Sequence, residues 1–218
     1  MKNSNECFDV VRQNKVRLRG WDFPHVSSNA LERDYSNDYF ASWSNFATQE
    51  YWRFYKSGQF IFLATVRETY DAMWKNKLLG VARQRIFMNK PDGLNWDKVP
   101  GFISIVNTAY MFTEIFEFFA RLCAAGVYSG DVQISIMASG IDGFVLAADE
   151  SRAWNEYFSF SGAVPFKYEQ SVSSDALYSD VVTNALQAVE EFFMRFGLTN
   201  APRDILRDEI SGLLERKG

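Results

Sequence analysis

Histidine and cysteine are almost absent from this chain of 218 residues, which has one histidine and two cysteines. Nucleophilic catalysis by a serine or cysteine normally needs a histidine base, and His25 is the only one available. A zinc site needs several histidine or cysteine ligands, and Cys7 and Cys123 lie too far apart in sequence to suggest a metal or disulfide framework. We therefore expect no metal site, and we interpret His25 as a histidine held by hydrogen bonding in a turn.

The glycine-rich loops that cradle phosphates are also missing, since neither Gly-x-x-x-x-Gly-Lys nor Gly-x-Gly-x-x-Gly occurs. We expect no ATP, dinucleotide or other cofactor. No basic leader followed by an apolar run and a cleavage site opens the chain. The longest apolar stretch, 101–125, contains Glu114, Glu117 and Arg121, and charges at mid-bilayer are costly. These observations predict a cytoplasmic protein without membrane contact.

Apolar and aromatic side chains are abundant, at 47% and 17% of the residues, which is enough for a sizeable core. No linker or repeat divides the chain, so we predict one domain over 1–218, with 1–11 as a loose N-terminal arm. Basic residues exceed acidic ones in 1–109, and the reverse holds in 110–218. This split is typical of a front half that faces nucleic acid, and equally of two differently solvated faces.

The stretch 101–125 predicts one long helix that is apolar over about two thirds of its girth at ~100° per residue. We expect a sheet on one side of this helix and another helix beside it. Its polar residues fall in one arc, which we predict to be solvated. That arc contains Asn107, Thr113, Glu114, Glu117 and Arg121.

Alternating side chains predict the strands. The clearest pattern is a hairpin at 51–66 around the turn Lys56–Gly58, with a second strand that is apolar on both faces and so expected to be central. A strand with one wet face is expected at 16–20, and loop with a short helix at 27–49. Residues 131–147 predict a second hairpin, and further strand pieces are expected at 157–160 and 166–169.

Helices are predicted at 68–78, from the cap Asp180 to Gly197, and from 200 onward. The stretch 80–100 is expected to be an excursion that leads to the long helix. The order of elements predicts an α+β fold: a mostly antiparallel sheet packed against a long buried helix and two C-terminal helices.

Basic residues interleaved with aromatic ones suit nucleic acid or a partner surface, because bases stack on aromatic rings and phosphates attract cations. The alternative is that the aromatic rings belong to the core and the arginines to solvated edges. The candidate binding residues are Arg17, Arg19, Trp21, Arg53, Tyr55 and Lys56.

A metal-dependent nuclease is a further hypothesis, because such enzymes need clustered carboxylates. Asp131, Asp142, Asp149 and Glu150 flank the predicted second hairpin. No Glu-x-Lys follows them on a strand, and turn chemistry explains the aspartates adequately.

The segment Trp21–Val26 is expected to fold back over the strand at 16–20. We predict that it buries Trp21 and Phe23 against the hairpin at 51–66, and that His25 is held by a local hydrogen bond and not by a metal.

The motifs Arg19-Gly20-Trp21-Asp22-Phe23-Pro24-His25 and Glu50–Phe60 resemble the C-terminal region of bacterial proteins whose N-terminal part is a Schlafen-like DNA-binding domain. The similarity in pattern extends through 101–125 and 131–147, and this chain lacks that N-terminal domain. The resemblance implies no catalytic residues. It implies a non-catalytic sensing or partner-binding module that works with a separate effector or DNA-binding subunit, in bacterial transcriptional control or antiviral (phage) defence, and direct nucleic-acid binding remains an alternative.

Overall fold

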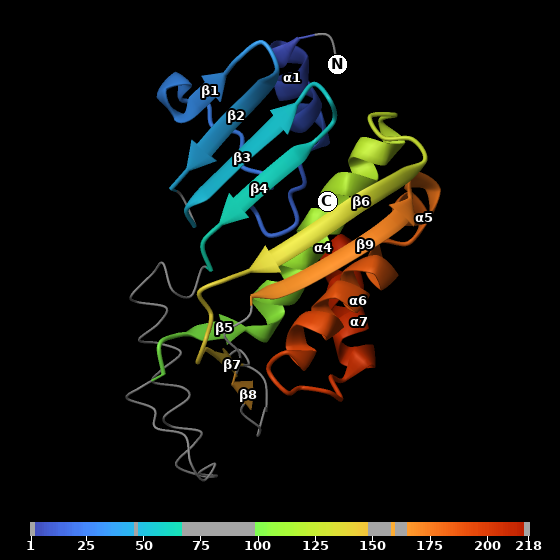
Figure 1. The fold of residues 1–218 in the computed structure, drawn as a ribbon. Coiled ribbons are helices and arrows are strands. Elements are labelled where there is room, and N and C mark those ends of the chain that lie inside the picture. Colours follow the sequence, from blue (N-terminus) through green and yellow to red (C-terminus); the bar gives the residue numbers. More distant parts are fainter. Residues whose placement is uncertain (1–2, 46–47, 67–98, 148–157, 160–164, 216–218) are drawn as a thin grey trace.

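The computed structural model describes residues 3–45, 48–66, 99–147, 158–159 and 165–215. Helices and mostly antiparallel strands both contribute, so the predicted α+β class is confirmed (Figure 1). The helix expected at 68–78, and nearly all of the excursion expected before the long helix, lie outside the described residues.

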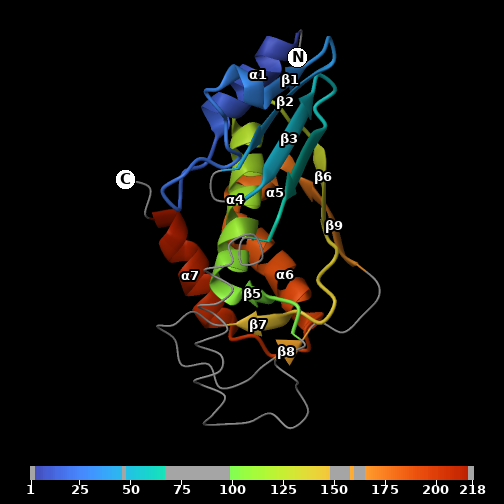
Figure 2. The ribbon, with the colours of Figure 1, turned by 90° about the vertical axis from the view of Figure 1, so that its left-hand side faces the viewer.

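Helix α4 (Ile105–Ala124) runs through the middle of the described structure, between the strands and the C-terminal helices (Figures 1 and 2). It begins later than predicted, because the Ser104 side chain accepts a hydrogen bond from the Asn107 amide at 3.1 Å and caps the helix there. The residues before the cap form strand β5 (Phe102–Ser104). A short apolar run suits a strand or a helix equally well, so the cap decides the boundary.

The first sheet has the antiparallel order β1-β2-β3-β4. The predicted hairpin is confirmed as β3 (Glu50–Tyr55) and β4 (Phe60–Ala64), joined at Gly58 with φ of 93°. The short helix expected before it is η1 (Ala30–Glu32). The rest of the expected loop at 27–49 is wrong, because it contains β1 (Arg33–Tyr35) and β2 (Tyr39–Ser44).

Strand β4 is not the central strand that was predicted. It is an edge of the described sheet, and Leu63 is 60% exposed. The apolar residues on its outer face are therefore partly or fully exposed. A run of apolar residues is the same in sequence whether its strand is buried or lies at the edge of a sheet.

The N-terminal arm is not loose from Ser4 onward, because residues Ser4–Asn14 form helix α1. The Asn3 side chain accepts a hydrogen bond from the Glu6 amide at 2.9 Å, and Cys7 and Val11 are buried under the first sheet. The strand expected at 16–20 is also wrong, since only Val16 makes a bridge, to Phe23. An amphipathic helix that begins in a polar stretch has too few apolar residues to stand out in the sequence.

Strand β6 (Asp131–Ala138) pairs with β9 (Phe166–Ser173) in register Asp131↔Ser173, so the predicted hairpin at 131–147 is wrong. After β6 the chain turns through Gly140 and Gly143 into β7 (Val145–Ala147). Strand β7 pairs in parallel with β5 and antiparallel with β8 (Phe158–Ser159). Alternation along β6 predicts which face is buried, but it does not predict the neighbouring strand.

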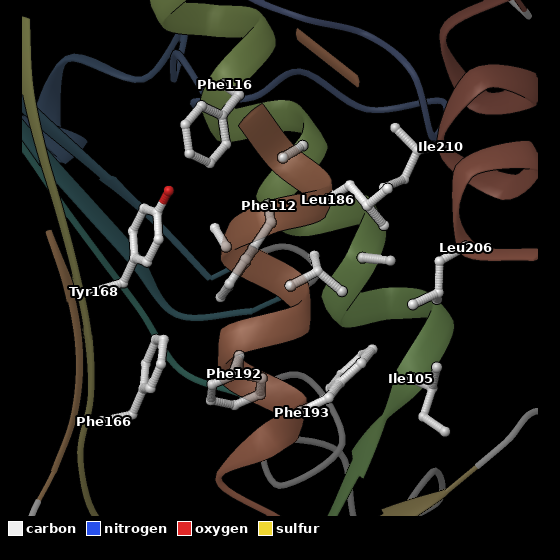
Figure 3. Packing of buried hydrophobic residues seen from close by; sticks show 14 of the residues in the cluster. Ile105, Phe112, Phe116, Phe166, Tyr168, Leu186, Phe192, Phe193, Leu206 and Ile210 are labelled. Atoms are coloured by element: carbon white, nitrogen blue, oxygen red, sulfur yellow. The ribbon is translucent and has the colours of Figure 1, made fainter. Parts of the chain in front are cut away.

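Three helices complete the fold: α5 (Ser174–Ser179), α6 (Val181–Met194) and α7 (Arg203–Glu215). The last two confirm the predicted pair, and Asp180 caps α6 by accepting from the Thr183 amide at 2.9 Å. The main core lies between β9, α4, α6 and α7, and Figure 3 shows its packing. The residues labelled there include Phe112, Phe116, Phe166, Tyr168, Phe192 and Phe193.

Phe118 on α4 is fully buried, with its ring 5.0 Å from that of Phe60 and 6.2 Å from that of Phe23. We expect Phe118→Ala to lower the free energy of unfolding by about 3–5 kcal/mol, because it leaves a cavity between α4 and the first sheet. Urea denaturation measures this change. Ile205→Ala, at a side chain that is 55% exposed on α7, should change it by less than about 0.5 kcal/mol, and equal losses would contradict the assignment of Phe118 to the core.

Candidate functional site

The polar arc of α4 is covered by the segment 15–23 and is not solvated as predicted. Glu114 is fully buried, and the Arg19 guanidinium binds it with both arms, Nε to Oε1 at 3.0 Å and a terminal nitrogen to Oε2 at 2.5 Å. Arg121 bonds Glu117 at 2.9 Å and donates to the carbonyl of Lys15 at 2.6 Å. Each polar group named here has a partner that offsets its loss of water.

The segment after Arg19 confirms part of the prediction for Trp21–Val26. Phe23 is buried, and its ring lies 4.8 Å from that of Phe62 in the hairpin. Trp21 is only half-buried, and the guanidinium carbon of Arg19 lies 4.7 Å from its ring centre. The carbonyl of His25 accepts a hydrogen bond from the Trp52 indole at 2.7 Å, which fixes this turn on the first sheet.

The predicted binding residues are not brought together. Arg19 and Trp21 lie beside α4, whereas Arg53 and Tyr55 lie on the outer face of the first sheet, opposite the buried Trp52 and Phe54. Lys56 in the hairpin turn is 3.5 Å from a carboxylate oxygen of Asp38, and Arg17 is exposed.

Arg53 organises the outer face of this sheet. Its guanidinium carbon lies 4.2 Å from the ring centre of Tyr39, and its nitrogens donate to the hydroxyls of Tyr51 at 2.7 Å and Tyr55 at 3.1 Å. The hydrogen bond to Tyr55 raises the pKa of Arg53. This face therefore presents aromatic rings held by one cation.

A cleft of about 570 Å³ lies between strands β4 and β6. Its floor is formed by one side of α4, and the two strands run beside it in the same direction (Figure 1). The cleft begins where Gly58 and Tyr128 meet, the Tyr128 hydroxyl donating to the Gly58 carbonyl at 2.7 Å. The floor residues are Met111, Phe112, Ile115, Phe118 and Phe119.

The backbone groups of both strands that face this cleft are left unpaired by the described strands. The Thr65 amide donates to the Gln49 carbonyl at 3.0 Å. Alternate residues before Thr65 therefore form backbone hydrogen bonds with β3, and the backbone groups of Phe60, Phe62 and Ala64 point away from β3. The Ser174 amide donates to the Gly130 carbonyl at 2.8 Å. By the same alternation, the β6 residues that point away from β9 are Asp131, Gln133, Ser135 and Met137.

A second cavity, of about 470 Å³, continues the cleft where β4 and β6 end. Apolar residues form most of its lining, and Arg19, Trp21 and Glu50 contribute polar groups. Glu50 Oε1 accepts from the Thr48 hydroxyl at 3.0 Å, whereas Oε2 is buried and accepts no hydrogen bond from the described residues. Burial raises the pKa of Glu50, against the hydrogen bond from Thr48, the nearby backbone amide of His25 and the charge of Arg19.

Sequence reasoning did not single out Glu50 or the two strand edges, and it placed Glu114 in a solvated arc although this side chain is buried. Glu50 could have been found from the alternation along β3. Residues two apart share one face of a strand, so Glu50 lies on the same inward face as Trp52 and Phe54.

The carboxylates of the nuclease hypothesis do not gather among the described residues. Asp131 and Asp142 are exposed at the start of β6 and in the following turn, and Asp149 and Glu150 lie outside the described ranges. Within those ranges, no three histidine, cysteine, aspartate or glutamate side chains are placed to hold a metal ion.

No helix in the described part of the chain is both long and apolar enough to span a bilayer. Comparison of the chain with protein-family models, with curated proteins and with solved structures gave no match. The geometry of the cleft and of its adjoining cavity is therefore what indicates the function.

The Arg19–Glu114 pair is tested by single and double replacement. Arg19→Met leaves a buried carboxylate unpaired, and we expect a loss of about 3–5 kcal/mol in the free energy of unfolding. Adding Glu114→Leu should restore most of this loss, because an apolar pair of similar volume needs no charge partner. Urea denaturation of all four proteins measures the coupling, and simple additivity of the two single losses would contradict a direct pair.

The raised pKa of Glu50 predicts a pH dependence of stability. The unfolded chain releases this proton near the ordinary pKa of 4.5 and the folded chain only at higher pH, so the contribution of Glu50 to folding falls as pH rises from about 4.5 toward neutrality. We expect Glu50→Gln to gain stability relative to the parent protein across that range. Unfolding free energies measured between about pH 4.5 and pH 7.5 check this, and a difference that does not change with pH would contradict it.

Proposed function

We propose that this protein is a non-catalytic recognition module that binds an extended segment of a partner protein as an added strand between β4 and β6. The observation that carries the proposal is the pair of open strand edges that face one cleft. Addition of a strand to an open edge is an established way of binding a peptide, in which main-chain hydrogen bonds give affinity.

The alternation of hydrogen bonds supports an extended guest on both sides. Phe60, Phe62 and Ala64 present amides and carbonyls from β4, and Gln133 and Ser135 present theirs from β6. Because β4 and β6 run in the same direction (Figure 1), a guest strand that is antiparallel to one is antiparallel to both. It would join the four-stranded sheet and the β6–β9 ribbon into one continuous sheet.

The side chains that border the cleft support an apolar guest. The floor is formed by aromatic and aliphatic residues of α4, and Phe60 and Phe62 of β4 are only half-buried beside it. Every second side chain of an extended guest would point down to this floor, and the others would point to solvent. We therefore expect a segment that alternates apolar and polar residues.

The strand edges that face the cleft, β4 and β6, differ from the opposite edges, β1 and β9, and this difference also supports the function. Exposed strand edges are normally protected by short length or by charge. Strand β1, at the outer edge of the first sheet, has three residues, and β9 carries the Lys167–Glu169 ion pair at 2.8 Å. Strand β4 has no charged residue, and β6 has only Asp131 at its first position.

The test uses proline on either edge of the β6–β9 ribbon. The amide of Ser135 faces the cleft and that of Ser171 faces away from it, so proline at either position removes no hydrogen bond between β6 and β9. Displayed peptides of about nine residues are selected on the parent protein. The binding of the best ones is then measured by fluorescence anisotropy.

We expect selected peptides to alternate apolar and polar residues. Ser135→Pro should weaken their binding roughly tenfold, which corresponds to the loss of one hydrogen bond, while Ser171→Pro should change it less than about twofold. Amide exchange at Phe62 should slow when the peptide binds. No selected peptide, or equal effects of the two prolines, would overturn the proposal.

Single-stranded nucleic acid is a second candidate ligand, supported by the outer face of the first sheet, where Tyr39, Tyr51 and Tyr55 surround Arg53. Base stacking on an aromatic ring contributes about 1–3 kcal/mol. If this face binds nucleic acid, Tyr55→Ala should weaken binding of an oligonucleotide at least fivefold, and affinity should fall with salt. Binding that ignores both changes, or no binding, would remove this candidate.

A further inference from the structure

The cavity beyond the ends of β4 and β6 adjoins the proposed peptide cleft. Phe62, Met111, Phe112 and Ile136 line both spaces, so the floor is continuous from one to the other. A guest antiparallel to β4 begins at this end of the cleft, because β4 ends at Ala64 beside the cavity. The cavity therefore receives the amino-terminal part of the guest.

One unsatisfied acceptor marks the polar side of this cavity. The Arg19 guanidinium is already bound on Glu114, and Glu50 Oε1 is occupied by the Thr48 hydroxyl. Glu50 Oε2 is the buried side-chain atom that accepts no hydrogen bond among the described residues. A buried acceptor without a donor is costly, and a ligand that donates to it would remove that cost.

The charges around Glu50 favour a cationic donor. Arg19 lies near enough to Glu50 to favour its ionised form, but the Arg19 guanidinium is bound on Glu114, so the Glu50 carboxylate forms no ion pair with a described residue. The apolar lining suits a long aliphatic stem that ends in the charge. A guanidinium prefers two carboxylate oxygens in a bidentate arrangement, whereas an ammonium group binds as a compact point charge.

We propose that Glu50 Oε2 binds the ammonium group of a lysine near the amino-terminal end of the guest segment, with the lysine stem in the apolar cavity. This inference rests on the proposed function, and it makes Glu50 the residue that determines specificity. Because Thr48 occupies Oε1, lysine is preferred over arginine.

The experiment compares peptides from the selection that carry lysine, acetyl-lysine or arginine at the position nearest the amino end. On the parent protein, acetyl-lysine should weaken binding at least tenfold, and on Glu50→Gln the two peptides should bind within about twofold of each other. Such coupling cannot come from a general loss of structure, because the same variant is compared with two peptides.

A second variant tests the role of Thr48. Thr48→Val keeps the shape of the side chain and frees Oε1, so arginine should then bind about as well as lysine. If Thr48→Val leaves the preference for lysine unchanged, the proposed roles of the two Glu50 oxygens, Oε1 bound to Thr48 and Oε2 to the lysine, are wrong.

The two proposals fail differently. Peptides whose binding is weakened by Ser135→Pro but shows no preference for lysine would overturn the role of Glu50 and leave the strand-binding function standing. A preference for lysine that survives in Glu50→Gln would likewise overturn the role of Glu50. If no peptide binds at the strand edges, the proposed function itself is wrong.

Discussion

The burial of Glu114 in the middle of α4 constrains the path of the first part of the chain. A carboxylate removed from water needs a charge partner and hydrogen bonds to remain tolerable. Arg19 supplies both, and Arg121 fixes the carbonyl of Lys15 on the same side of α4. The chain between these points therefore runs along this side of α4, and the residues that follow bring Phe23 against Phe62 and Phe118.

The path of residues 15–23 along α4 determines where the first sheet can lie. Phe23 occupies the space under β4, and the Trp52 indole bonds the carbonyl of His25, so the sheet is fixed on the segment 15–25 as well as on α4. The β6–β9 ribbon lies beside the first sheet on the same side of α4 and is held by α5 and α6 (Figures 1 and 2). Because each sheet is anchored separately, nothing in their packing forces β4 and β6 to pair, and the cleft is the result.

The sequence predicted elements whose signal is local. Asp180 and Gly197 delimit a helix, Gly58 closes a hairpin, and the α+β class follows from their order. It did not predict the partners of β6, because alternation is the same whichever strand lies beside it. The predicted binding residues lie in separate places for a similar reason. Arg19 and Arg53 have similar sequence surroundings, yet Arg19 compensates a buried carboxylate and Arg53 lies on the outer face of the first sheet.

The side of α4 that faces the strands explains why the cleft suits an extended segment. Its apolar residues form the floor, and β4 and β6 run beside this floor in the same direction (Figure 1). A strand added between β4 and β6 requires these to be separated by two strand spacings, about 10 Å. At one end the Tyr128 hydroxyl bonds the Gly58 carbonyl and ties the chain before β6 to the chain before β4. At the other end the cleft continues into the cavity that Glu50 lines, so it is closed by the Tyr128 side chain where β4 begins and opens onto a carboxylate where β4 ends. A guest strand in such a cleft meets different chemistry at its two ends, which is what gives the site a direction.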